Sequence, residues 1–160
     1  MGIKRFTTKL ATGLLVAVLA AGCASTTSAQ SSSAGNAQSL YKRLGGYDAI
    51  AAVSDDFIGR LASDKQLSRF LVGLSSDSQK RLRQLVVDQL CAATGGPCLY
   101  IGRDMKTVHA GLNITESDWD LTVKHLIASL DKFKVPEKEK NEFLALASSL
   151  KPDIVQQPKK

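Results

Sequence analysis

Histidine and cysteine are the residues of this sequence with the chemistry to bind a cofactor or cross-link the chain. There are two histidines, His109 and His125, and three cysteines, Cys23, Cys91 and Cys98. Two histidines are too few for a His-rich metal cage, but one is enough as the axial ligand of a large apolar cofactor. The sequence has no HExxH zinc spacing, no glycine-rich phosphate loop and no G-x-S-x-G elbow. A lone helical histidine is also commonly a surface residue, so both interpretations of His109 stay open from its type alone.

The elements that would position these residues are helices. Apolar residues recur three or four positions apart, and no run alternates with period two, so we predict an all-α domain of four longer helices plus short ones. Thr115 caps the third helix, and Pro152 predicts a stop after the fourth. Gly45-Gly46 and Gly95-Gly96-Pro97 predict corners. The four periodic segments are Asp48–Ala62, Gln79–Ala93, Glu116–Phe133 and Pro136–Leu150.

Length and charge limit the classes of protein to consider. The chain has 160 residues, of which 44% are hydrophobic and 22% charged, as expected for one globular domain. Its formal charge is +6, but Lys4, Arg5 and Lys9 lie in a leader without acidic residues, which leaves 18 basic against 15 acidic residues. So small a surplus does not favour a nucleic-acid binder, and no nucleic acid is expected as a partner.

The leader has the features of an export signal. Residues 1–22 combine a basic start with an apolar run, Leu14–Ala21, that is too short to span a bilayer. Ala20-Ala21-Gly22-Cys23 resembles the lipobox of bacterial lipoproteins, although that motif prefers Leu where Ala20 stands. The resemblance implies that Cys23 is acylated and anchors an exported protein to a membrane of the cell envelope. The alternative is an ordinary signal peptide cut nearby.

Composition also divides the rest of the chain. Residues 23–38 are uncharged and rich in Ser, Thr and Gln, which predicts a flexible tether, and residues 39–160 form the folded domain. An acidic residue directly after the lipidated cysteine is associated with inner-membrane retention. Ala24 and Ser25 are not acidic, so the periplasmic face of the outer membrane is favoured. Cys91 and Cys98 are an even pair in an exported protein, which favours a disulfide, with two free thiols as the alternative.

Five short motifs follow one another along the predicted domain. They are LYKRLGG (40–46), DFIGRL (56–61), LSRFL (67–71), GGP (95–97) with Tyr100 and Gly102, and MKTVH (105–109). Their order and spacing, from about Leu40 to Leu150, are similar to those of the group I truncated haemoglobins. The resemblance implies a two-over-two α-helical sandwich around haem b (iron protoporphyrin IX).

The resemblance makes His109 the proximal ligand of the iron. Met105 lies one helical turn earlier and would share the face of His109. His125 is conceivable as a sixth ligand, but a solvent-exposed or hydrogen-bonded side chain is favoured. Candidates to meet the haem propionates, or else ordinary surface charges, are Lys80, Arg83, Arg103 and Lys106.

The distal side departs from the family. Ile58 stands where many members have Tyr, and Val86 where they often have Gln, so the predicted pocket is aliphatic. Gln89 and Tyr100 are the polar residues that could donate a hydrogen bond to the bound gas instead of the missing Tyr and Gln. The phenylalanine that wedges the haem in the family would be Phe70, whereas the strict register selects Leu71. The residues assigned to the distal helix face are Leu82, Val86 and Leu90.

These expectations lead to a haem protein that reversibly binds dioxygen, nitric oxide or carbon monoxide. The first alternative is a redox enzyme, such as a nitric oxide dioxygenase, that works with an unidentified reductase. The second is a haem-free helical envelope lipoprotein that binds a protein partner. The aliphatic pocket favours gas binding over turnover, because turnover needs a stable dioxygen adduct and an electron donor.

Overall fold

The structure is a computed structural model that describes residues 38–156. The signal peptide, the lipidation site at Cys23 and most of the tether, all sequence predictions, lie outside these residues. Within the described range every regular element is helical, so the prediction of an all-α domain is confirmed. None of the described helices has both the length and the apolar character needed to cross a membrane.

The four longer helices appear where periodicity predicts them. The second of them starts at Ser76, three residues before its predicted start, because the hydroxyl of Ser75 accepts a hydrogen bond from the Ser78 amide and caps the helix there. In chain order the elements are α1 (Leu40–Arg43), α2 (Gly46–Ser63), the 3-10 helix η1 (Ser68–Phe70), α3 (Ser76–Ala93), α4 (Met105–His109), α5 (Glu116–Lys132), α6 (Glu137–Ser149) and α7 (Lys151–Ile154).

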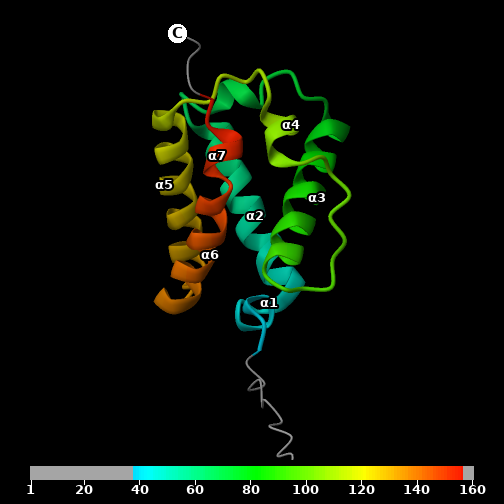
Figure 1. The fold of residues 1–160 in the computed structure, drawn as a ribbon, viewed down its shortest axis with the longest axis vertical. Coiled ribbons are helices and arrows are strands. Elements are labelled where there is room, and N and C mark those ends of the chain that lie inside the picture. Colours follow the sequence, from blue (N-terminus) through cyan, green and yellow to red (C-terminus); the bar gives the residue numbers. More distant parts are fainter. Residues whose placement is uncertain (1–37, 157–160) are drawn as a thin grey trace, which may run out of the picture. The chain divides into compact units, whose positions relative to one another are not determined.

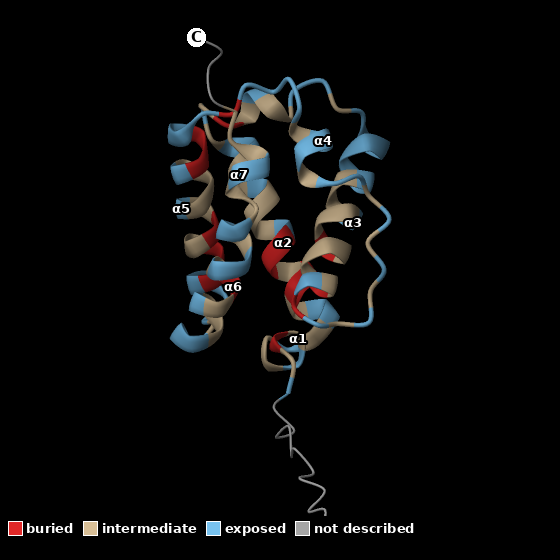
Figure 2. Ribbon diagram, viewed as in Figure 1, coloured by how far each residue is buried: buried red, intermediate tan, exposed pale blue. Residues whose placement is uncertain are grey.

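Helix α2 lies at the centre of the helical domain formed by residues 38–156, between α3 on one side and α5 on the other (Figure 1). Helices α5 and α6 lie side by side, so the pair α2–α3 faces the pair α5–α6. Buried residues lie on the faces that these helices turn toward one another (Figure 2). This is the predicted two-over-two sandwich, and its core has two clusters: Leu40, Val53, Leu126, Leu130 and Phe143, and then Ile50, Ala51, Val87 and Cys91.

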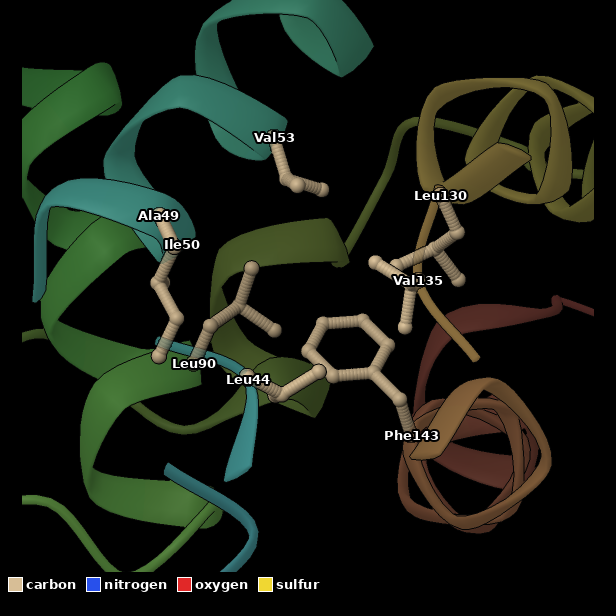
Figure 3. A pocket seen from close by; sticks show the side chains of 8 residues that line it. All are labelled: Leu44, Ala49, Ile50, Val53, Leu90, Leu130, Val135 and Phe143. Atoms are coloured by element: carbon tan, nitrogen blue, oxygen red, sulfur yellow. The ribbon is translucent and has the colours of Figure 1, made fainter. Parts of the chain in front are cut away.

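The first cluster surrounds a very small cavity. The ring of Phe143 points from α6 toward Leu44 and Val135, and Leu90 of α3 closes the opposite side (Figure 3). The cavity has a volume of about 20 Å³ and an entirely apolar lining. That is room for about one water-sized molecule, so this part of the core is close-packed.

A buried carboxylate joins the start of α5 to the turn between α2 and α3. Asp118 is 1% exposed, and it forms a capping box with Thr115. It also accepts hydrogen bonds from Gln66 Nε2 and Arg69 Nη2, each at 2.8 Å. Burial alone would raise the pKa of Asp118, but the bonds from Gln66, Thr115 and Arg69 outweigh it and lower that pKa to about 2.

Helix α3 ends at a tight corner. A disulfide joins Cys91 to Cys98, the pairing that the cysteine count favours, with their Cα atoms 5.7 Å apart. A Cβ added at Gly96 would lie 2.5 Å from the Tyr41 ring and 2.7 Å from Cys91 Sγ, so only glycine fits there. The corner fixes the direction in which the chain leaves α3 toward α4.

Candidate functional site

A pocket of about 190 Å³ opens where α2, the turn after it and the start of α3 meet. Three of the residues assigned to the distal side from the sequence line it together: Ile58 from α2, Leu71 from the turn and Leu82 from α3. Ala62, Val72 and Leu74 complete its apolar wall. Residues separated by up to 24 positions are therefore brought to one aliphatic surface.

Helix α3 has two apolar faces. Val87 and Cys91 are 0% exposed and pack in the cluster between α2 and α3. Leu82 and Val86 lie on another face and are only half-buried. A helix with a second apolar face beside an open pocket is suited to cover a large apolar group.

The remaining residues assigned to the distal side lie in other surroundings. Leu90 lines the small core cavity rather than the open pocket (Figure 3). Phe70 is half-buried, and the Arg69 guanidinium carbon lies 4.3 Å from the centre of its ring. Of the two candidates for the residue that wedges the haem, Leu71 is thus the one in the pocket wall.

Two polar residues of the pocket were missed by the sequence analysis. Ser68 of η1 and Gln79 of α3 line it beside the aliphatic residues. Gln79 Nε2 donates a hydrogen bond to the Leu74 carbonyl at 3.1 Å. Ser68 lies inside the LSRFL motif and Gln79 at the start of a periodic segment, but both are polar and lie off the apolar stripes, so no pattern marks them as pocket residues.

Tyr100, considered as a source of a hydrogen bond in the pocket, is held within its own loop. Its hydroxyl donates to the Arg103 carbonyl at 2.7 Å. A Cβ at Gly102 would lie 2.2 Å from that hydroxyl, so the ring folds back over this glycine. Burial raises the pKa of Tyr100, with a smaller contribution from the charge of Asp104, so the phenol stays neutral.

His109 is the last residue of α4, and its ring is held from inside the helix. Its Nδ1 lies 2.8 Å from the Met105 carbonyl oxygen, one turn earlier. A carbonyl can only accept, so Nδ1 carries the proton, and a neutral ring then has its lone pair on Nε2. This is the tautomer and the orienting contact that metal-binding histidines use. Met105 therefore contacts His109 through the Met105 backbone oxygen.

His125 is engaged elsewhere. Its Nε2 lies 2.9 Å from Asp64 Oδ2, at the end of α2. This bond from His125, together with those from the Leu67 and Gln66 amides, lowers the pKa of the Asp64 carboxyl. The arrangement agrees with the hydrogen-bonded role favoured from the sequence, rather than with a sixth ligand.

Two of the four basic candidates for the propionates are paired with acids on the surface. Arg83 makes a two-pronged contact with Asp55, at 2.5 and 2.9 Å. Lys80 lies 3.4 Å from Asp77, three residues before it. Both pairs are solvent-exposed, so neither excludes a contact with a second anion.

The residues present fit a haem group. A histidine-ligated haem needs an imidazole nitrogen with a free lone pair and a broad apolar surface. The orienting bond of His109 supplies the first, and the half-buried apolar face of α3 with the aliphatic pocket supplies the second. Within residues 38–156, no three side chains of His, Cys, Asp or Glu gather closely enough to hold a bare metal ion.

Comparison with known proteins shows which family this chain resembles. Residues 39–156 match the family described as bacterial-like globin. A group 1 truncated hemoglobin, GlbN, from Mycolicibacterium paratuberculosis is 37% identical over 116 residues, covering 72% of this chain and 83% of that protein. A second group 1 truncated hemoglobin, from Tetrahymena pyriformis, is 26% identical over 118 residues, covering 74% of this chain and 95% of the other.

Solved structures show the same arrangement of helices. The truncated hemoglobin of Tetrahymena pyriformis in its Fe(III) form superposes with a TM-score of 0.68 at 25% identity, covering 75% of this chain and 100% of that one. Chlamydomonas reinhardtii THB1 gives a TM-score of 0.63 at 28% identity, covering 76% of this chain and 100% of that one. The two-over-two sandwich of this chain therefore matches each of these two solved structures over that structure's whole length.

Proposed function

Because this chain belongs to the bacterial-like globin family, as a group 1 truncated haemoglobin, we propose that it binds haem b through His109 and reversibly binds diatomic gases. The gases are dioxygen, nitric oxide and carbon monoxide. The observation that carries the proposal is the bond between His109 Nδ1 and the Met105 carbonyl, which directs the Nε2 lone pair outward from α4.

The chain's own residues divide the work around the haem. Bound haem supplies an iron atom that coordinates small diatomic molecules. His109 would hold that iron, and the Met105 carbonyl keeps the imidazole in the binding tautomer. Ile58, Leu71 and Leu82 would give the haem an aliphatic wall that excludes water.

Gas binding without turnover is the activity that this pocket supports best. Nitric oxide dioxygenase activity needs a long-lived dioxygen adduct, which donors of hydrogen bonds stabilise. The aliphatic residues Ile58, Leu71 and Leu82 provide no such donor.

Absorption spectroscopy on histidine variants tests the proposal. Wild-type protein loaded with one equivalent of haem is expected to give a Soret band and a reversible ferrous gas complex. His109→Ala is expected to lose the haem or to shift the Soret band, because the iron loses its imidazole ligand.

The second histidine provides a matched control. His125→Ala removes a ring that bonds Asp64, and it is expected to keep the wild-type spectrum. An unchanged ferrous spectrum in His109→Ala would disprove ligation by this residue. Wild-type protein that binds no haem would favour the envelope lipoprotein that binds a protein partner.

A further inference from the structure

The turn that follows His109 is bonded to a residue far along the chain. Helix α7 packs against α4, and Gln156 follows α7 by two residues. Gln156 Nε2 donates to the His109 carbonyl at 2.6 Å, and its Oε1 accepts from the Asn113 amide at 2.9 Å. The backbone amide of Gln156 donates to the Ile114 carbonyl at 2.8 Å. One residue thus makes three hydrogen bonds across the segment from 109 to 114.

Apart from the buried side chain of Ile114 at its end, that segment has little else to fix its conformation. Gly111 and Asn113 have φ angles of 82° and 53°, in the left-handed region that costs free energy for Asn. Leu112, between them, is 40% exposed and contributes little burial. A strained turn with a solvent-exposed apolar residue persists only when outside contacts determine it.

Helix α4 is also too short to hold its own geometry. It has five residues, and a helix of that length is unstable without contacts from the rest of the fold. Its first turn is capped by Asp104, whose side chain accepts from the Thr107 amide. At its other end, the His109 carbonyl accepts from the Leu112 amide and from Gln156, so Gln156 supplies the contact from outside the turn.

We propose that Gln156 is a positioning residue for the proximal histidine. Its side-chain amide holds the backbone of His109 and Asn113 at the same time, which sets how α4 presents the imidazole. The Met105 carbonyl fixes the ring relative to α4, and Gln156 fixes the end of α4 relative to α7. This inference rests on the proposed function, because it assigns His109 to the iron.

Two variants separate the halves of the amide contact. Gln156→Ala removes both side-chain hydrogen bonds. Gln156→Glu keeps an oxygen to accept from the Asn113 amide but has no N–H to donate to the His109 carbonyl. Gln84→Ala is the matched control, because Gln84 is an exposed glutamine whose amide bonds Tyr47 and Asp88 instead.

Hydrogen exchange in the haem-free protein measures whether the Gln156 side chain holds the turn. The Asn113 amide is expected to exchange at least tenfold faster in Gln156→Ala than in wild type, and to stay protected in Gln84→Ala. Gln156→Glu is expected to keep most of that protection. Equal exchange of Asn113 in wild type and Gln156→Ala would overturn the proposal, because the contact would then not hold the turn in solution.

Resonance Raman spectra of the ferrous haem protein measure the effect on His109. The iron–histidine stretching band is expected to shift or broaden in both Gln156 variants, and haem transfer to apomyoglobin to become about tenfold faster. Both readouts should be unchanged in Gln84→Ala. A wild-type band in Gln156→Ala, with fast Asn113 exchange, would make Gln156 a fold contact only and overturn the positioning role.

The two failures can be told apart. If wild-type protein gives no iron–histidine band at all, the proposed function fails, and the positioning role fails with it. If wild-type protein gives the band and the Gln156 variants do not change it, the proposed function stands and this inference alone fails.

Discussion

Ile58 sets the chemical character of the distal pocket. With Leu71 and Leu82 it presents carbon and hydrogen only, and such a wall cannot donate a hydrogen bond to a polarised gas molecule. The polar lining residues are Ser68 and Gln79, and one N–H of the Gln79 amide already donates to the Leu74 carbonyl. The aliphatic wall formed by Ile58, Leu71 and Leu82 should therefore show little preference for gases that carry partial charge, which leaves Ser68 and the second N–H of Gln79 as the remaining donors of the pocket.

The corresponding prediction is that dioxygen leaves this haem quickly. A hydrogen bond to a polarised ligand is worth about 1–3 kcal/mol, or about one to two decades in dissociation rate. Ile58→Tyr is expected to slow dioxygen release by that factor while changing carbon monoxide release much less. Stopped-flow release rates measure both, and Ile58→Leu serves as the aliphatic control.

A different result would identify another donor. Slow release of dioxygen from wild type, with no further slowing in Ile58→Tyr, would contradict the prediction. Gln79 and Ser68 would then be the residues to substitute, since Tyr100 is bonded to the Arg103 carbonyl.

Single residues were predictable where a motif or a periodic stripe singled them out. Ile58 belongs to the DFIGRL motif and Leu82 to the apolar stripe of its helix, and both line the pocket. Gln79 and Gln156 could not be found in this way. Each acts through a hydrogen bond whose partner is set by the folded backbone, and no local pattern marks such a pair.

At the scale of the helices, Asp118 links the start of α5 to the turn that carries the pocket wall. It caps α5 through Thr115 and holds that turn through Gln66 and Arg69, while Leu71 follows Arg69 by two residues. Its carboxylate is buried and charged, so its bonds matter more than those of a surface acid. Protonation of Asp118 should loosen both elements together.

This link predicts a particular acid dependence of stability. The pKa of Asp118 falls from its ordinary 3.8 to about 2 in the folded protein, so the unfolded chain takes up the proton first as the pH falls. The stabilisation, on the order of 2 kcal/mol, is full above about pH 4 and is lost toward pH 2. Urea unfolding measures the free energy of unfolding of wild type and of Asp118→Asn. The difference between the two should become smaller as the pH falls from about 4 to 2.

Asp120→Asn is the control for that series, because Asp120 is an exposed acid on the same helix. It should follow the wild-type curve at every pH. A gap between wild type and Asp118→Asn that stays constant from pH 5 to pH 2 would contradict the assignment to this carboxyl.

The disulfide at the end of α3 gives a second prediction for an element. Closing the short loop from Cys91 to Cys98 should stabilise the fold by about 2 kcal/mol through the unfolded state. Cys98→Ser, which leaves Cys91 buried, should lower the free energy of unfolding by that amount. Denaturant melts measure it, and the difference should vanish when wild type is reduced with dithiothreitol.

Alkylation provides the opposing test. Two thiols that react freely in the folded, exported protein would show that the bond does not form in the cell.

The helices themselves were largely predictable, because each longer one buries an apolar stripe. Their ends were less so. The polar first turn of α3, from Ser76, has no apolar residue to mark it, and Ser75 alone signals the cap. Pro152 was predicted to stop the helix before it, and it also lies in the first turn of α7, where a missing N–H costs nothing.

At the scale of the whole chain, the globin domain is one part of a longer sequence. The family match begins at residue 39, after a basic and apolar leader and an uncharged stretch. We propose from these sequence features that the protein is exported and held at the envelope membrane by acyl chains on Cys23. The uncharged stretch would then separate the haem from the membrane surface.

Mass spectrometry tests that proposal. Protein extracted from native membranes should weigh more than the chain that begins at Cys23, by a diacylglyceryl group. Cys23→Ser should abolish both the added mass and membrane retention, while the haem spectrum stays unchanged. A soluble wild-type species with an unmodified Cys23, or one cut elsewhere, would contradict it.

The bond between Gln156 and His109 also has a consequence in time. The two residues are 47 positions apart, and ribosomes add about 5–20 residues per second, so about 2–9 s separate their synthesis. During that interval the nascent chain carries its histidine on a turn that nothing downstream yet holds. A chain that ends before Gln156 lacks this contact, so the proximal turn can close only after synthesis has passed that residue.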